Sequence, residues 1–296
     1  MDYPMTAFEV WKHLLIIGQA KEESKKYQLE EVIKCLNDPR ELFNKVASQD
    51  GLYFLRGREN LVRERIKREK ISAQKIKRLF KIVRYLRIVP FIQFIGATGR
   101  VAMKNAKASS DLDLLIVFNQ GKIFSGRFLV FLMLQIMGKR RHGKKISNRV
   151  CLNHFLVFGA KPQVQDIFSA HEYSFMLPVF YSKNSVFAWQ ESFSWVEQYL
   201  PNHVFTKKNS KTLPDVGLAR AVRVFLELLL RANFWEKILK NIQIKKINNN
   251  TESHNKQGVL IVTDQELAFW PEFEKQGPRI WEKFAKKFDQ IPVDEL

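Results

Sequence analysis

Residues 94–118 read FIGATGRVAMKNAKASSDLDLLIVF, and their pattern decides the fold. A short apolar strand is expected to run into a turn at Gly99, and Asp111 and Asp113 open a second, strongly apolar strand. Side chains alternate along a strand, so the two carboxylates point to one face of the sheet. Neighbouring carboxylates repel each other unless a divalent cation lies between them, and a glycine turn offers backbone N–H groups to an anion. The pattern therefore predicts a site for a metal-chelated phosphate such as a nucleoside triphosphate.

The chain carries a large excess of positive charge. Its 296 residues include 49 Lys and Arg against 30 Asp and Glu, which gives a formal net charge of +19. An excess of this size favours a polyanionic partner, most often RNA or DNA, and a solvated basic surface is the alternative. Hydrophobic residues make up 46% of the chain and 24 residues are Phe, so the chain can bury the cores of two or three compact units.

Compartment and membrane signals predict a cytoplasmic protein. Cys35 and Cys151 lie far apart and match no metal-binding spacing, which favours a reducing compartment. The first residues, MDYPMTAFEVWKH, lack the basic region and apolar core of a signal peptide. The longest apolar run, residues 128–137, is shorter than the roughly 20 residues that span a bilayer. We therefore expect no membrane partner, and the sequence leaves the oligomeric state open.

Residues 1–57 are expected to form a small N-terminal domain. Apolar spacing predicts helices near 6–15 and 29–36, a third helix from Asp38 to about Asp50, and a strand at 52–55. Three short helices and a strand resemble a winged helix-turn-helix domain, which binds nucleic acid, although a three-helix unit also serves in dimerisation. The residues expected on the exposed side of the third helix are Arg40, Asn44 and Lys45.

Residues 58–89 form a basic helical connector between this domain and the glycine turn. Its helix is expected to begin at a Ser72 cap, with an apolar stripe facing inward and cations facing outward. The wider segment 56–88 contains thirteen Lys and Arg but only three Glu. Together with a second basic segment at 139–149, it is the predicted RNA- or DNA-binding surface.

Residues 90–175 are expected to form the core domain around the two strands, with a buried helix over 127–137 and a third strand over 150–158. Residues 176–296 are expected to form a mainly helical C-terminal region. The helices predicted beyond the third strand cover 166–200 and 215–240, and a last fragment with a strand and a helix is expected from Val259 to the end. The predicted fold class is α+β, a mixed sheet flanked by helices.

The glycine turn and the DLDLLIV strand resemble the nucleotidyltransferase fold, the family of polymerase-β-type and antibiotic-adenylating enzymes; the resemblance covers residues 90–160. It implies that Gly99 and Arg100 bind a triphosphate and that Asp111 and Asp113 hold Mg²⁺ on its oxygens. An acceptor hydroxyl, on RNA or DNA if the basic segments bind the substrate, would attack the α-phosphate in line and receive the nucleoside monophosphate.

Two positions depart from the family pattern. Arg100 stands where the family has a serine, and a guanidinium binds phosphate more strongly than a hydroxyl but is bulkier. The family's third carboxylate, on the next strand, has no counterpart, because residues 114–165 contain no Asp or Glu. Strand pairing offers Asn153 there, an amide that can ligate Mg²⁺ but cannot accept a proton. Of the nearest downstream acids, Asp166 and Glu172, the helical Glu172 is the candidate catalytic group.

Three alternatives stay open. If no proton acceptor reaches Asp111 and Asp113, the chain is a nucleic-acid-binding regulator with a catalytically degenerate domain. GATGRVA also resembles the GxTGxxG turn of dinucleotide-binding dehydrogenases, although the acids here open the second strand instead of closing it. In the third alternative, the two aspartates only cap a strand at the surface. The histidines His142, His154, His171 and His203 show no ligand spacing.

Overall fold

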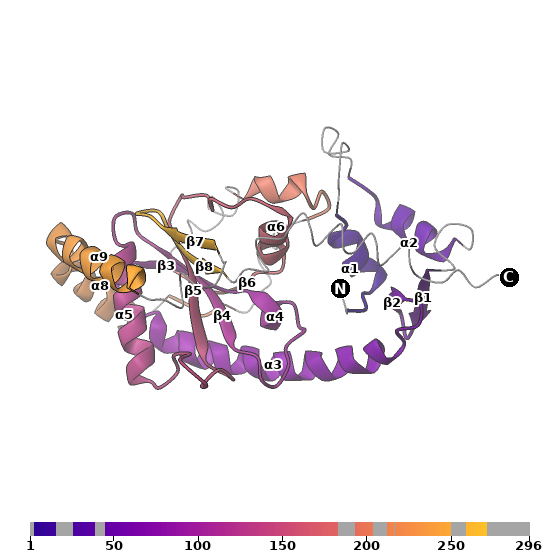
Figure 1. Cartoon of the computed structure of the whole chain (residues 1–296), viewed down its shortest axis with the longest axis horizontal. Coiled ribbons are helices and arrows are strands. Elements are labelled where there is room, and N and C mark those ends of the chain that lie inside the picture. The colour runs from indigo at the N-terminus through magenta and orange to yellow at the C-terminus, as the bar shows by residue number, and fades with distance from the viewer. Residues whose placement is uncertain are drawn as a thin grey trace.

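The computed structural model describes residues 3–15, 26–38, 45–182, 193–203, 212–215, 217–249 and 259–270. These residues form an α+β protein with a six-stranded mixed sheet and a separate two-stranded sheet (Figure 1). The α+β class predicted from the sequence is therefore confirmed. Residues 39–44 of the predicted third helix, with Arg40 and Asn44, lie outside the described residues.

The N-terminal unit contains helices α1 (Ala7–Lys12) and α2 (Leu29–Asn37) and a hairpin of β1 (Val46–Gln49) and β2 (Leu52–Leu55). Asp50 and Gly51 connect the strands with φ angles of 53° and 72°. Two consecutive positive φ values are typical of the type I′ turn, whose twist matches a hairpin. The sequence predicted β2 only; the prediction that the third helix continues through Val46 is wrong, because these residues pair with β2.

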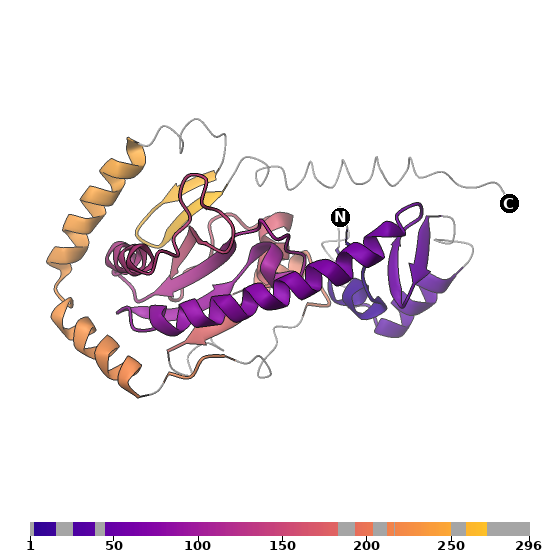
Figure 2. The same cartoon turned by 90° about the horizontal axis from the view of Figure 1, so that it is seen from below.

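A single helix, α3 (Asn60–Leu86), of 27 residues connects the N-terminal unit to the large sheet (Figure 2). The prediction that Ser72 caps its start is wrong. Ser72 lies inside the helix, where its Oγ donates to the Arg68 carbonyl oxygen at 2.8 Å and accepts from the Ala106 N–H at 3.0 Å. The hydroxyl thus joins the middle of α3 to the loop that precedes Asp111.

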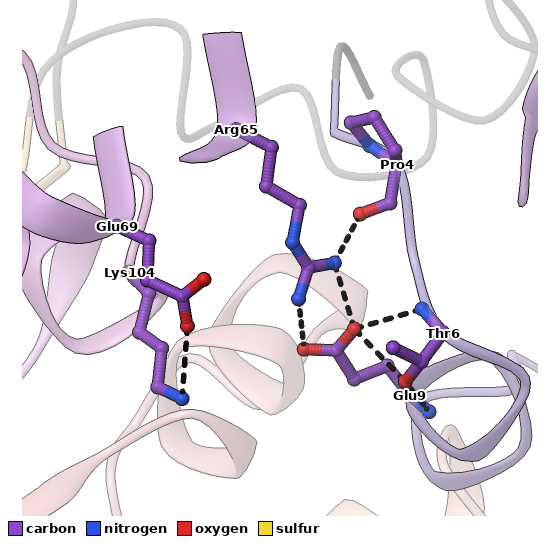
Figure 3. A network of polar contacts seen from close by, with 6 residues as sticks. All are labelled: Pro4, Thr6, Glu9, Arg65, Glu69 and Lys104. Carbon is purple, nitrogen blue, oxygen red and sulfur yellow. Dashed lines mark hydrogen bonds and ion pairs between the residues drawn. The ribbon is translucent and has the colours of Figure 1, made fainter. Parts of the chain in front are cut away.

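An Arg65–Glu9 ion pair joins the start of α3 to α1 (Figure 3). Arg65 donates from Nη1 and Nη2 to the two carboxylate oxygens of Glu9 at 2.7 and 2.9 Å, and Nη1 also donates to the Pro4 carbonyl oxygen. Glu9 in turn accepts from the Thr6 N–H as part of a capping box at the start of α1. A partly buried bidentate pair of this kind fixes the direction in which the N-terminal unit meets α3.

The six-stranded sheet has the order β6-β3-β4-β5-β8-β7. Its strands are β3 (Ile92–Ala97), β4 (Leu112–Phe118), β5 (Val150–Val157), β6 (Leu177–Tyr181), β7 (Val259–Val262) and β8 (Glu266–Trp270). The central pair β4 and β5 is parallel, and the other described pairs are antiparallel. The helices around it are α4 (Gly99–Ala102), α5 (Ile123–Ile136), α6 (Ile167–Ser174), α8 (Leu218–Leu229), α9 (Asn233–Asn248) and the 3-10 helix η2 (Ser194–Gln198).

Side chains of β4 alternate between two apolar cores. Leu114 and Ile116 pack with residues of α3 and α5 on one face. Leu115 and Val117 pack on the other face with α6 and η2. Asp113 precedes Leu115 by two residues, so both side chains point to the same face of the sheet. The Asp113 carboxylate therefore lies on the α6 side.

The C-terminal half contains more strand than the sequence predicted. The helix expected over 166–200 is interrupted, because α6 ends at Ser174 and β6 follows. The expected mainly helical region 176–296 also supplies β7 and β8 to the same sheet. None of the described helices combines the length and the apolar character needed to cross a bilayer.

Candidate functional site

Gly99 lies at the point where β3 turns into α4, directly against Asp113. The Thr98 N–H donates to the Asp113 carbonyl oxygen at 3.1 Å, which holds the turn beside β4. Gly99 has a φ of 63°, and a Cβ atom at this position would come within 2.5 Å of Asp113 Oδ2. Both the backbone conformation and the close approach require glycine here. The structure therefore brings the predicted phosphate turn and the predicted metal ligand together.

Asp111 and Asp113 meet Cys151 at the start of β5. One ligand atom from each of the three residues lies within 4.8 Å of the others. Asp113 pairs with Cys151 in the parallel register of β4 and β5. Cys151 was not predicted from the sequence, because the register shifts between Asp113 and Leu115 and so cannot be counted from the strand pattern.

Asn153, the predicted metal ligand of β5, also borders Asp113. Its Nδ2 lies 3.4 Å from Asp113 Oδ1, and its buried Oδ1 has no hydrogen-bond partner among the described residues. A buried amide oxygen without a partner lowers the stability of the fold unless a hydrogen-bond donor or a cation contacts it. The groups around Asp113 that could ligate a metal ion therefore include carboxylates, a thiol and an amide.

Glu172 supplies the third carboxylate from α6. Its Oε2 accepts the Gly99 N–H at 2.8 Å, so the predicted catalytic acid contacts the glycine turn. Asp166, the other acid near the end of β5, caps α6 by accepting the Ser169 N–H at 2.7 Å. Asp166 thus has a structural role, whereas Glu172 faces the site.

Two carboxyl groups of the site have raised pKa values. Burial, followed by the charges of Asp111 and Glu172, raises the pKa of Asp113 to about 7. Burial likewise raises the pKa of Glu172 to about 7, although the Gly99 N–H partly opposes this shift. Carboxyl groups that are buried together hold protons until a cation neutralises them. The site is therefore poised to bind positive charge.

Two arginines lie beside these acids. Arg141, from the basic loop between α5 and β5, donates from Nη1 to Asp111 Oδ2 at 2.5 Å and to Cys151 Sγ at 3.5 Å. Arg100 is exposed on α4, and its charge lowers the pKa of Asp113. Burial raises the pKa of the Cys151 thiol to about 12, so it is protonated at neutral pH despite Arg141. Guanidinium groups at the rim are suited to phosphate oxygens.

The sheet topology excludes the dehydrogenase interpretation of GATGRVA. A dinucleotide-binding βαβ unit requires parallel strands on either side of the glycine turn. β3 and β4 pair antiparallel instead. The interpretation of Asp111 and Asp113 as simple surface caps also fails, because Asp113 is enclosed by Gly99, Cys151 and Asn153.

The cations of α3 divide into an inward and an outward group. Arg65 pairs with Glu9, and Lys75 Nζ donates to the carbonyl oxygens of Ala108 and Ser110 and to Asn148 Oδ1. These buried cations serve the fold. The exposed ones lie on one face of the helix, most of them three, four or seven residues apart. We call this face the α3 stripe: Arg63, Lys67, Lys70, Lys77, Arg78, Lys81 and Arg84.

No family model, curated protein or solved structure matches this chain. The geometry of the site is therefore what indicates a function for this chain. That geometry joins a glycine turn, two strand aspartates, a thiol and a helical glutamate in one place. Such a set can chelate a divalent cation and present a phosphate to a proton acceptor.

Proposed function

We propose that the chain is a Mg²⁺-dependent nucleotidyltransferase that moves a nucleoside monophosphate from a nucleoside triphosphate to an acceptor hydroxyl. The observation that carries the proposal is the convergence of Gly99, the Asp111–Asp113 pair and Glu172 on one turn. The proposed fold is the polymerase-β-like one, joined to a winged-helix-like N-terminal domain. Residues of this site could then bind the phosphates, hold the metal ion and accept the proton, which are the tasks that phosphoryl transfer requires.

The residues present fit a divalent cation. Asp111 and Asp113 offer hard carboxylate oxygens, and the unpartnered Asn153 Oδ1 offers a further oxygen of the type Mg²⁺ prefers. The neutral Cys151 thiol is a poor ligand for Mg²⁺. When bound, the ion would neutralise the charge that develops on the phosphate oxygens.

The chain's own groups would perform the remaining tasks. The Gly99 N–H, which now donates to Glu172, would donate to a phosphate oxygen, and Arg100 and Arg141 would bind the outer phosphates. Glu172, freed from Gly99, would accept the proton of the acceptor hydroxyl. A bond then forms between that oxygen and the α-phosphorus, the bond to the bridging oxygen breaks, and pyrophosphate leaves with the electron pair.

A second candidate function is a nucleic-acid-binding regulator whose transferase-like domain does not catalyse nucleotidyl transfer. The specific observation in its favour is that Asp113 pairs with Cys151, so neither Cys151 nor Asn153 supplies on β5 the third carboxylate that the resemblance implies. The α3 stripe and the N-terminal hairpin would then be the functional surface. Under either function we propose that RNA or DNA is the macromolecular partner.

Nucleotide binding and transfer distinguish the two functions. Wild-type protein is incubated with labelled ribonucleoside triphosphates, Mg²⁺ and bulk RNA, and both bound nucleotide and labelled RNA are measured. If the chain is a transferase, labelled RNA should form, and the Asp113→Asn variant should abolish it. The control is Asp264→Asn, at an aspartate with 67% of its side chain exposed, and it should leave the labelling unchanged. Mg²⁺-dependent binding without labelled RNA or any other labelled acceptor would favour the regulator.

A further inference from the structure

Helix α8 presents its polar face to the protein. Arg223 has 4% of its surface exposed and donates to Asp215 Oδ2 at 2.6 Å and to the Arg87 carbonyl oxygen at 3.1 Å. Glu227, one turn later, accepts the Phe91 N–H at 2.9 Å. These bonds fix the rotation of α8 about its own axis. A surface helix ordinarily packs its apolar face inward, so this orientation is inverted.

The connection from α8 to α9 is attached by polar contacts as well. Lys122 Nζ donates to the Arg231 carbonyl oxygen at 2.7 Å, at the end of α8. Glu236 accepts the N–H groups of Phe124 and Ser125 at 2.8 and 2.9 Å, and so caps the start of α5. Both helices are therefore held in place without using the apolar face of α8.

That apolar face is exposed. Leu218, Phe225, Leu228 and Leu229 recur at helical spacing on α8, with 80%, 59%, 68% and 58% of their surface exposed. Phe234 and Trp235 continue the exposure at the start of α9. The two helices form an arc at the end of the molecule opposite α1 and α2 (Figures 1 and 2). An apolar patch of this kind marks a binding surface.

The exposed charges of α8 and α9 favour an anionic partner. Within residues 217–249 the acids are Glu227 and Glu236, and both point toward the protein. The exposed charged residues of this segment are all cations: Arg220, Arg231, Lys237, Lys245 and Lys246. A second copy docked on the same face would bring these cations against one another.

We propose that the α8–α9 arc binds the surface of an anionic lipid bilayer. Leucines and aromatic residues would enter the region between headgroups and acyl chains, and exposed cations of the two helices would contact the anionic headgroups. The sequence led us to expect no membrane partner, and the proposal changes this for surface association only, since no described helix spans a bilayer. It does not depend on the proposed transferase function.

Vesicle flotation tests the proposal with full-length protein. The vesicles contain phosphatidylcholine with or without phosphatidylserine. Because a chain of charge +19 binds anionic vesicles non-specifically, the decisive variant keeps the charge unchanged: Phe225→Gln with Leu228→Gln. We expect this variant to lose about tenfold in affinity for anionic vesicles. The matched control is Ile66→Gln, at a side chain of α3 with 47% exposure, which should bind as wild type does.

Insertion also has a spectroscopic signature. Lipids brominated on their acyl chains should quench part of the tryptophan fluorescence of the wild-type protein, and Trp235→Phe should remove that part. Equal vesicle binding by wild type and the Phe225→Gln/Leu228→Gln variant, with unchanged circular dichroism, would overturn the proposal. So would a wild-type dimer in solution that the same variant converts to monomer, because the face would then belong to a second copy.

Discussion

Arg141 covers Asp111: its Nη1 lies 2.5 Å from Asp111 Oδ2 and 3.5 Å from Cys151 Sγ. The contact is held from the backbone, because the Arg141 N–H donates to the Val150 carbonyl oxygen at 2.9 Å at the start of β5. The guanidinium thus occupies part of the space in which a divalent cation would meet the carboxylates. Arginine and cation compete for Asp111, and a bound triphosphate would offer the arginine a replacement anion.

Arg141→Gln should therefore strengthen binding of a divalent cation alone while weakening binding of the cation–nucleotide complex. Because the Arg141 side chain is 44% exposed, we expect the cation affinity to rise by up to about fivefold, the range of a partly solvated ion pair. Isothermal titration with Mn²⁺, with and without nucleotide, measures both effects. Arg140→Gln on the same loop is the control, and unchanged cation affinity in Arg141→Gln would contradict the competition.

Cys151→Asp should add the missing strand carboxylate opposite Asp113. We expect the Mg²⁺ affinity of the site to rise by about tenfold, because an anionic oxygen replaces a neutral thiol. Cys151→Ser is the matched control, since it removes the thiol without adding charge. If transfer to RNA appears or increases only in Cys151→Asp, the domain keeps an active geometry. A loss of nucleotide binding in Cys151→Asp would show that β5 does not face the metal.

Gly99→Ala should abolish nucleotide binding and lower the free energy of unfolding. The alanine would adopt a φ of 63° and would place its Cβ 2.5 Å from Asp113 Oδ2. Strain of this kind costs about 1–3 kcal/mol. Gly121→Ala separates the two causes, because Gly121 has a φ of 67° with no atom within 4 Å of its Cβ position. Urea unfolding should show a smaller loss for Gly121→Ala; equal losses would refute the close contact at Asp113.

Glu172→Gln should flatten the pH dependence of stability. Burial raises the pKa of Glu172 from 4.5 to about 7, so the folded state holds a proton that the unfolded chain releases. The resulting stabilisation is complete below about pH 4.5 and is lost as the pH rises through about 7. Thermal unfolding between about pH 5 and 8 should therefore show a shallower decline for Glu172→Gln than for wild type. The exposed Glu30→Gln should follow wild type, and a similar slope in all three proteins would contradict the assignment.

A triple variant of the α3 stripe should reduce the salt dependence of RNA or DNA binding. It carries Lys70→Gln, Lys77→Gln and Lys81→Gln. Each phosphate that the protein no longer neutralises lowers the slope of log affinity against log salt by about 0.7 for single strands and 0.9 for duplexes. The control substitutes Lys237, Lys245 and Lys246 on α9 and removes the same net charge. If both triple variants change the slope equally, net charge and not the α3 stripe determines binding.

The central strand of the site could be predicted from the sequence because its signals are local. The apolar run that follows Asp-Leu-Asp predicted β4, and the glycine at position 99 predicted the turn before it. Cys151 and Glu172 could not be placed equally well. The position of Cys151 depends on a register shift between β4 and β5, and that of Glu172 depends on how α6 packs over the sheet. The length of α3 was missed because Ser72 looks like a cap unless its tertiary partner, the Ala106 N–H, is known.

The most direct test of the proposed transfer follows the two ends of the triphosphate. The protein is incubated with Mg²⁺ and bulk RNA in parallel reactions that contain nucleoside triphosphate labelled at the α- or at the γ-phosphorus. The geometry of Gly99, Asp113 and Glu172 predicts that α-label enters the RNA while γ-label is released as pyrophosphate, and that Asp113→Asn prevents both. Transfer of γ-label, or pyrophosphate release that persists in Asp113→Asn, would contradict the account.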